Sequence, residues 1–430
     1  MKGGEDVRKK FLILTLVLLL LLPLALPISA AEPTADEAET ALLYCFHTDS
    51  VLYTKNADTP IATGNTAQLM TALLVLETYP DLMTNVTLTE DLLPGWYAPG
   101  DYRTLADYGF HKGKTLPVKD LFAAMVIENA NCASLLLASL VSGSRAAFVE
   151  AMNNRAASLG MQNTVYKNPT GEDAEGAVTT ASDLLPLAKL LYQNPDFMAL
   201  ASAAYYDMQS SDFRIYTRNY MIGKWYTSTY LYASADGMKA GYTDNSGNTL
   251  VATSTEANGY SYLAVILGGK DLNFQNMSYS LAKELFHFGS TAFSYREVLS
   301  SAKLITTLPI NKGEGITKIS LFPKEAINAY LPKSAKESEL TVSYSVIRES
   351  LDAPFEKGTP VGEVTVSYQG AVIGRTELVT GNGAKRAQNA ALTDRLSTVV
   401  KPLLILLGIV LSLIAIKLFV SRYHKKQDQA

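Results

Sequence analysis

The stretch from Thr249 to Leu267 reads TLVATSTEANGYSYLAVIL. Its two halves, residues 249–254 and 260–267, are rich in β-branched and aromatic side chains, and Asn258-Gly259 lies between them. Asn-Gly between two such runs is a strong signal for a β-hairpin, because both residues accept the positive φ angles of a type I′ turn. The sequence therefore predicts a pair of antiparallel strands here.

A second hairpin and several helices are predicted elsewhere in the first part of the chain. Residues 41–47 and 51–55 are strand-like runs separated by Thr48-Asp49-Ser50, which predicts another hairpin near the start of the chain. Apolar periodicity, together with Pro and Gly stop signals, predicts helices at residues 67–77, 118–127, 132–140, 144–159, 182–191 and 273–293. Helices between two antiparallel hairpins indicate an α+β or three-layer domain and not a repeated βαβ unit.

The character of the chain changes after Phe293. Short alternating runs follow, with Lys-Gly, Pro and Gln-Gly turn signals between them, at residues 316–321, 340–346, 361–368 and 371–378. They predict a small all-β domain at residues 300–382. The next segment is polar and rich in alanine, and we interpret residues 383–400 as a stalk.

The two ends carry targeting and membrane signals. Lys2 and Arg8 precede an apolar run and the small residues Ser29-Ala30-Ala31, so residues 1–31 are predicted to be a cleaved signal peptide, with an uncleaved anchor as the alternative. Residues 402–420 are apolar and would span ~28 Å as a helix, about one bilayer core. A transmembrane helix with a cytoplasmic tail at 421–430 is favoured over an amphipathic surface helix.

Composition excludes several classes of function. The net charge is −4 and the basic residues are scattered, so nothing indicates nucleic-acid binding. His47, His111 and His287 have no metal-ligand spacing, no G-x-S-x-G elbow is present, and no cofactor is expected. Cys45 and Cys132 would be able to pair in an exported protein, but two buried free thiols are an equal alternative.

The stretch Thr63–Leu73, TGNTAQLMTAL, resembles the nucleophile motif of the serine-type D-alanyl-D-alanine carboxypeptidases, the low-molecular-mass penicillin-binding proteins. That motif reads Pro-Ala-Ser-x-Thr-Lys-Ile-Met-Thr-Ala-Leu. Asn65 stands at the position of the serine nucleophile and Gln68 at that of the lysine base. Residues at i and i+3 share one helix face, which brings a hydroxyl beside an amine. An asparagine has no nucleophilic hydroxyl, and a glutamine amide takes up no proton near neutral pH.

Two further motifs support the resemblance. Asn129-Ala130-Asn131 matches the Ser-Gly-Asn motif with its serine replaced, and Asn131 would hold the substrate backbone. Residues 236–243, DGMKAGYT, match the family's Asp-Gly-x-Lys-Thr-Gly-Tyr-Thr. There, Lys239 would face a substrate carboxylate, Ala240 lacks the hydroxyl that would assist it, and Gly241 would let an extended peptide approach the strand edge.

The resemblance covers nearly all of residues 38–380 and implies the architecture. We expect a β-lactamase/DD-peptidase-like domain at residues 38–295, followed by the small all-β domain and the C-terminal transmembrane helix. Together with the predicted signal peptide and C-terminal helix, it indicates a bacterial single-pass membrane protein whose bulk lies outside the cytoplasm, at the cell wall.

Three functions follow as hypotheses. The leading one is a pseudoenzyme that binds peptidoglycan stem peptides or a cell-wall protein without hydrolysing them. The second is an active hydrolase of the serine-type peptidase family, which would use a non-standard nucleophile such as Thr66 or Cys132. The third is a structural or interaction protein that uses the tyrosine-rich segment 205–232 or the β domain as its contact surface.

Overall fold

The computed structural model describes residues 31–90, 92, 105–224 and 227–427, without the side chains of 389–396 and 419–427. The predicted signal peptide, apart from its last residue, lies outside the described residues. So do Trp225 and Tyr226 of the tyrosine-rich segment and the side chains of the predicted tail. The chain divides into two compact units, with the boundary after Phe293.

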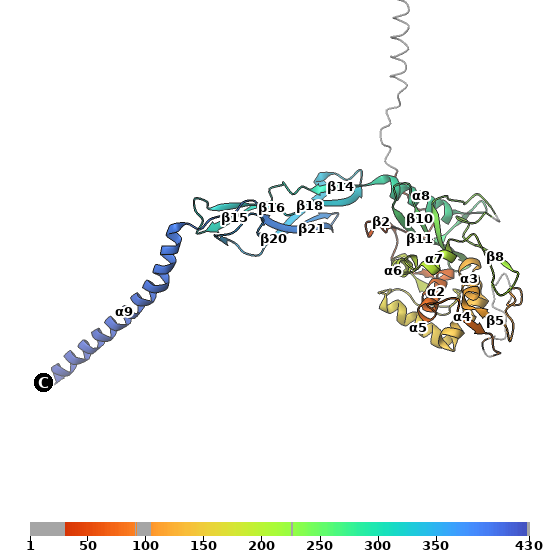
Figure 1. Cartoon of the computed structure of the whole chain (residues 1–430), viewed down its shortest axis with the longest axis horizontal. Coiled ribbons are helices and arrows are strands. Elements are labelled where there is room, and N and C mark those ends of the chain that lie inside the picture. The colour runs from red at the N-terminus through yellow and green to blue at the C-terminus, as the bar shows by residue number, and fades with distance from the viewer. Residues whose placement is uncertain (1–30, 91, 93–104, 225–226, 428–430) are drawn as a thin grey trace, which may run out of the picture. The chain divides into compact units, whose positions relative to one another are not determined.

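An antiparallel sheet forms the frame of the first unit (Figure 1). Its strand order is β2-β1-β11-β10-β9, with β9 at one edge. The hairpin predicted at 249–267 is the β10–β11 pair, and the predicted opening hairpin is β1–β2. The strands are β1 (Thr40–Cys45), β2 (Ser50–Lys55), β9 (Ala235–Thr243), β10 (Gly247–Thr255) and β11 (Ser261–Gly269).

Four short two-stranded sheets connect the loops of this unit. They are β3 (Ile61–Ala62) with β6 (Val178–Thr179), β4 (Asn85–Thr87) with β5 (Thr115–Pro117), β7 (Tyr205–Asp207) with β8 (Arg214–Tyr216), and β12 (Asp271–Leu272) with β13 (Gln275–Asn276). The β7–β8 pair lies in the tyrosine-rich segment, which is therefore partly a hairpin.

The predicted helices are all present. They are α2 (Ala67–Thr78), α3 (Val118–Glu128), α4 (Asn131–Ser142), α5 (Arg145–Ser158), α6 (Ala181–Tyr192) and α8 (Met277–Ala292). Two short helices were not predicted, η1 (Gly64–Thr66) and α7 (Pro195–Ala201). The helix predicted from residue 273 begins later, because the Asn276 side chain caps α8 by accepting from the Ser278 amide. Asn273 and Phe274 before it have positive φ angles and form a turn.

Helices cover both faces of the sheet. Residues 262–267 of β11 are all fully buried, although successive side chains of a strand point to opposite faces. Leu42 of β1 belongs to the core cluster that includes α2, whereas the next residue, Leu43, lies against Gly289 of α8. Figure 1 accordingly shows α8 on one side of the sheet and α2, α6 and α7 on the other. The domain is a three-layer α+β structure, and the predicted fold class is confirmed.

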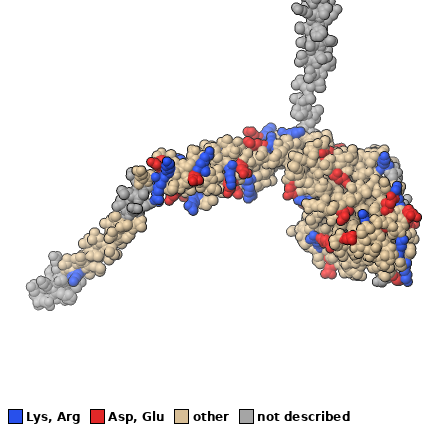
Figure 2. Space-filling view, viewed as in Figure 1, with Lys and Arg blue, Asp and Glu red and all other residues tan. Residues whose placement is uncertain are grey.

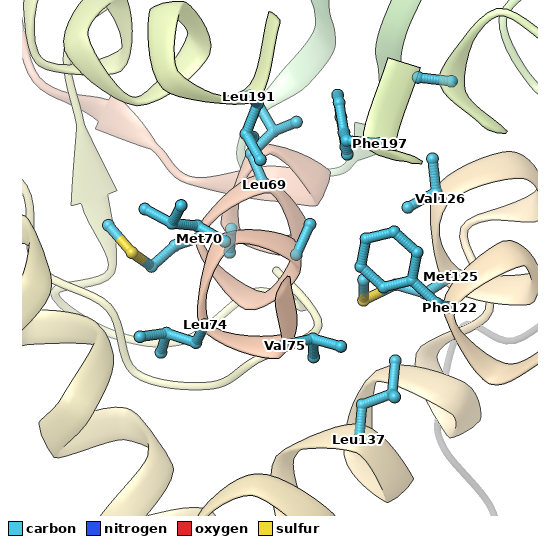
Figure 3. Packing of buried hydrophobic residues seen from close by; sticks show 14 of the residues in the cluster. Leu69, Met70, Leu74, Val75, Phe122, Met125, Val126, Leu137, Leu191 and Phe197 are labelled. Atoms are coloured by element: carbon cyan, nitrogen blue, oxygen red, sulfur yellow. The ribbon is translucent and has the colours of Figure 1, made fainter. Parts of the chain in front are cut away.

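Helix α2 is the centre of the helical layer. Its residues 67–76 are all buried, so this part of the helix has no solvent face and requires neighbours on every side. Figure 3 shows α2 surrounded by side chains of the other helices, among them Phe122 of α3, Leu137 of α4, Leu191 and Phe197. A helix held from all sides gives a fixed position to Gln68 in its first turn and to Asn65 in the preceding turn η1.

The second unit contains the predicted all-β domain, which ends with a strand at Thr380. A six-stranded sheet has the order β18-β20-β21-β16-β15-β19, and β14 pairs with β17. The strands are β14 (Phe293–Leu299), β15 (Thr306–Asn311), β16 (Lys318–Pro323), β17 (Ile327–Pro332), β18 (Leu340–Val346), which follows the short helix η2 (Glu337–Glu339), β19 (Leu351–Asp352), β20 (Pro360–Tyr368) and β21 (Ala371–Thr380). Strand β14 lies before the predicted start at residue 300.

A single long helix, α9 (Gln388–Gln427), ends the described chain. It includes much of the segment that we interpreted as a stalk, because residues 388–401 contain no glycine or proline to break a helix. Within α9, Ser397–Leu418 is long and apolar enough to cross a membrane. Figure 2 shows this part of the helix as a nearly uncharged surface.

Candidate active-site pocket

A pocket of about 920 Å³ opens in the first unit, where the start of α2, the turn between α3 and α4, and the edge strand β9 meet. It contains most of the residues that the sequence singled out. Its lining is Asn65, Tyr108, Glu128, Asn129, Ala130, Asn131, Asn168, Glu172, Asp173, Arg218, Tyr220, Ala240, Gly241, Tyr242, Thr243, Asp244, Asn248, Asn276 and Tyr279. Amide, carboxyl and phenol groups dominate this wall.

Asn65 binds the edge of β9 with its own side chain. Its Oδ1 accepts a hydrogen bond of 3.2 Å from the backbone N–H of Tyr242. A Cβ atom added at Gly241 would lie 2.3–2.6 Å from the Asn65 side chain, so only glycine fits there. The sequence analysis expected Gly241 to admit a peptide backbone. In the structure, the space beside Gly241 is taken by Asn65.

Gln68 fills a buried cage one turn further along α2. Its Nε2 faces three acceptors, Oδ1 of Asn131 at 3.1 Å, the Thr170 carbonyl at 3.1 Å and the Asn129 carbonyl at 3.4 Å. An amide nitrogen carries two protons and a lysine ammonium three, so the cage offers one acceptor more than glutamine can satisfy. The Gln68 Oε1, in turn, has no hydrogen-bond partner among the described residues. The surroundings of Gln68 therefore suit an amine better than an amide.

Asn129 makes a second contact with the β9 edge. It ends α3 in the left-handed conformation, with φ of 62°, which asparagine tolerates better than most residues. From there its Nδ2 donates to the Ala240 carbonyl at 2.8 Å. Asn65 and Asn129 thus occupy two neighbouring outward-facing backbone groups of an edge strand, which would otherwise be available to a ligand.

Lys239 is placed differently from the expectation. Its side chain is buried, the residue is 3% exposed, and it does not line the pocket. The amine donates to the carbonyls of Met125 at 2.6 Å and Val126 at 3.3 Å, near the end of α3. Burial lowers the pKa of Lys239 well below its usual range. The expected contact with a ligand carboxylate would require the amine to leave these carbonyls.

Replacing Lys239 by methionine is expected to flatten the pH dependence of stability. Because the folded-state pKa is depressed, the unfolded chain binds the additional proton at pH values between that pKa and 10.5. The contribution of Lys239 to the free energy of unfolding is therefore greatest above pH 10.5 and falls as the pH is lowered, by up to about 1.4 kcal/mol per pH unit.

Urea unfolding of the detergent-solubilised full chain at pH 7.5 and pH 9.5 would measure this effect. From pH 7.5 to pH 9.5, the free energy of unfolding of the unaltered chain should rise relative to that of Lys239→Met. Lys167→Met, which removes an exposed lysine of the same unit, is the matched control. If the free energy of unfolding changes equally with pH in all three proteins, Lys239 is charged in the folded state.

The pocket also holds charged groups that the sequence analysis did not select. The carboxylate of Glu128 accepts from the Tyr108 hydroxyl at 3.1 Å and from Arg218 at 3.4 Å. At the other end of the wall, Asp173 accepts from the Thr243 hydroxyl at 2.6 Å. Glu128 directly precedes Asn129, so its position beside a motif was the only available signal in the sequence.

The two alternative nucleophiles do not line the pocket. Thr66 is 1% exposed, and its hydroxyl donates to the Thr63 carbonyl at 2.5 Å. Cys132 is 6% exposed, and Cys45 and Cys132 are both buried and are not joined by a disulfide. The described residues include no group of three or more His, Cys, Asp or Glu side chains arranged to hold a metal ion.

An antiparallel sheet, a fully buried helix beside it and a pocket between the helix start and the sheet edge define a β-lactamase/DD-peptidase-like protein. The chain belongs to the D-alanyl-D-alanine carboxypeptidase family, whose model matches residues 28–271. A second model, described as the C-terminal domain of penicillin-binding protein 5, matches residues 293–386. The family predicted from the motifs is therefore confirmed.

Individual relatives agree with this assignment. The chain is 24% identical to the D-alanyl-D-alanine carboxypeptidase DacF of Bacillus subtilis, over 87% of this chain and 94% of the relative. It is 26% identical to DacC of Escherichia coli, over 81% and 86%. The crystal structure of penicillin-binding protein 5 from Haemophilus influenzae shares the fold, with a TM-score of 0.57, 23% identity and coverage of 83% of this chain and 100% of the other.

Proposed function

We propose that this chain is a non-hydrolytic member of its family, which binds the stem peptides of peptidoglycan. The proposal rests on two amides that stand where the family motif has its nucleophile and its base. Asn65 lines the pocket, and Gln68 is buried against Asn131 of the same lining. An amide supplies neither a nucleophilic oxygen nor a proton acceptor near neutral pH. Asn65 also holds the Tyr242 N–H, a donor that would otherwise be available to an oxyanion.

The same proposal includes an extracytoplasmic location. A signal peptide at residues 1–31, the family domain at 38–295, the β domain at 300–382 and a stalk at 383–400 would precede a transmembrane helix at 402–420 and a cytoplasmic tail at 421–430. The apolar segment of α9, Ser397–Leu418, supports the anchor, and the family supports a position at the cell wall.

The alternatives have less support. A peptidase that used Thr66 or Cys132 would require a side chain that is buried and outside the pocket lining to reach a ligand. A purely structural role would leave a pocket of about 920 Å³ without a use. A cell-wall protein as partner remains compatible with the proposed peptide binding.

Binding and hydrolysis can be separated in one experiment. The full chain in detergent is titrated with Nα,Nε-diacetyl-L-lysyl-D-alanyl-D-alanine by calorimetry, and the same samples are assayed for released D-alanine. We expect saturable binding and no release above the rate without protein. Arg218→Gln should weaken binding because Arg218 lines the pocket, whereas Arg214→Gln, outside the pocket, should not.

Each contrary result selects another function. Release of D-alanine would establish a peptidase, and its loss in Cys132→Ala or Thr66→Val would identify the nucleophile. Absence of binding in the unaltered chain would reject the proposed function and favour an interaction protein.

A further inference from the structure

One edge of the six-stranded sheet in the β domain is the strand β18, whose residues Leu340–Val346 read LTVSYSV. Among the described strands, β18 pairs only with β20, so one side of its backbone has no strand beside it. Charges, prolines and short length are the usual devices that keep an edge strand from pairing with another chain. The opposite edge strand, β19, has two residues, whereas β18 has seven and contains neither a charge nor a proline.

Hydrogen bonds to β20 determine which backbone groups of β18 face the open edge. The N–H of Ile347, directly after the strand, donates to the Val361 carbonyl at 2.8 Å, in the same register as the β18–β20 pairs. Because backbone groups alternate between the two sides of a strand, the odd-numbered residues of β18 bond to β20. The N–H and C=O groups that point to the open edge are therefore those of Leu340, Val342, Tyr344 and Val346.

The hydrophobic core of the domain is incompletely covered along this strand. Val364 and Val366 of β20 are fully buried. The residues of β18 that pack against the same cluster are only partly buried, and they are Leu340, Val342 and Val346. Tyr344 lies on the same face, since it alternates in step with them, and it is 50% exposed. A further strand beside β18 would cover apolar surface and also satisfy backbone groups.

The residue pattern of β18 is complementary to itself. In an antiparallel pair of two β18 strands centred on Ser343, Leu340 lies opposite Val346 and Val342 opposite Tyr344, on the face toward the core. On the other face Thr341 lies opposite Ser345, and Ser343 lies opposite its own copy. Apolar side chains thus face apolar ones, and the small hydroxyl side chains face one another.

The backbone groups of such a pair match as well. The residues that point to the open edge, with even numbers, are opposite one another in this register, so their N–H and C=O groups can bond across the pair. A shift by one residue would bring the core-facing side chains of one copy opposite the hydroxyl side chains of the other. The register is therefore specified by the pattern.

We propose that β18 is a self-association surface, at which two copies of this chain join their β domains into one antiparallel sheet. This inference goes beyond the proposed function, because it requires neither the pocket nor the binding of a peptide. Like charges opposite each other would oppose the pairing of identical strands, and β18 carries none.

A cysteine at the centre of the strand tests the geometry. In the proposed pair the two copies of residue 343 are not hydrogen-bonded to each other, so their Cα atoms lie ~4.5 Å apart, within the range of a disulfide. The Ser343 side chain is exposed, and the two native cysteines are buried. Oxidation of full-length Ser343→Cys in detergent, with copper phenanthroline and air, should convert the monomer band of a non-reducing gel into a covalent dimer. Ser301→Cys, at an exposed serine between β14 and β15, is the matched control and should remain monomeric over the same time.

Charges at the same position test the association without oxidation. Ser343→Lys places two ammonium groups opposite each other and Ser343→Glu two carboxylates, so each variant alone should dimerise about fivefold more weakly than the unaltered chain. A mixture of the two variants should form mixed dimers at least as tightly as the unaltered chain, because opposite charges then face each other. Sedimentation velocity over a dilution series in detergent measures these dissociation constants, and Ser301→Lys should leave the dissociation constant unchanged.

Two results would overturn the inference. One is a monomeric unaltered chain at every concentration, together with equal cross-linking of Ser343→Cys and Ser301→Cys, which is also the result expected if β18 binds a strand of a different protein. The other is a dimer that Ser343→Lys and Ser343→Glu do not weaken, because such a dimer forms through another surface, for example α9. None of these measurements involves peptide binding, so the proposed function is tested separately.

Discussion

The full-length chain carrying Asn65→Ser and Gln68→Lys together is expected to become acylated by benzylpenicillin, whereas the unaltered chain is expected to form no adduct. The expected change is from no covalent product to a stoichiometric one. Removal of a nucleophile alone can reduce turnover by ~10⁶ in a triad enzyme, so its return should have a comparably large effect. Intact mass of the detergent-solubilised protein measures the result directly.

The structure explains why these two substitutions should be accommodated. The three oxygens around Nε2 of Gln68 match the three donors of a lysine ammonium, and the unpartnered Gln68 Oε1 would be removed. Replacing Asn65 removes the amide oxygen from the Tyr242 N–H, which then becomes available to the acyl oxygen. The nucleophile, its base and an oxyanion donor would thus be restored by two changes.

Single variants and a third substitution are the controls. Gln68→Lys alone has no nucleophile and should remain unlabelled. Adding Asn129→Ser to the double variant should accelerate labelling, because it frees the Ala240 carbonyl. An adduct on the unaltered chain would overturn the non-hydrolytic proposal. No adduct on any variant would mean that more than these positions prevents the chemistry.

Phe122→Ala is expected to destabilise the first unit by about 3–5 kcal/mol, a large part of the stability of a typical domain. Phe122 is fully buried on α3 and faces α2 in the core (Figure 3). Its loss removes apolar contacts and leaves a cavity next to α2, the helix that carries Gln68 and directly follows Asn65 and Thr66. Urea unfolding followed by far-UV circular dichroism should show an earlier transition.

The matched control for this prediction is Phe274→Ala. Phe274 has the same side chain, but it is fully exposed in the turn before α8, with a relative exposure of 106%. Its replacement should change the stability by less than about 0.5 kcal/mol. Similar effects of the two substitutions would show that Phe122 does not contribute through core packing.

Local patterns predicted most of the elements because the signals for them are local. Asn258-Gly259 and the flanking apolar runs were sufficient for the β10–β11 hairpin, since turn type and strand period are properties of neighbouring residues. The sequence did not predict the start of α8 or strand β14, because neighbouring residues alone do not decide them. The Asn276 cap competes with a helical pattern that extends further, and β14 exists by pairing with β17.

The sequence by itself determined the family, the α+β class and the all-β domain, and it placed amides at residues 65 and 68, because residue types and their spacing are sufficient for these conclusions. Only the tertiary structure decided what the remaining groups do. The amine of Lys239 donates to the carbonyl of Met125 near the end of α3, although the two residues are 114 positions apart in the sequence. This contact keeps the amine out of the pocket. Asn65 reaches Tyr242 across 177 positions. Such contacts depend on how α2, α3 and β9 pack together, and no local pattern carries that information.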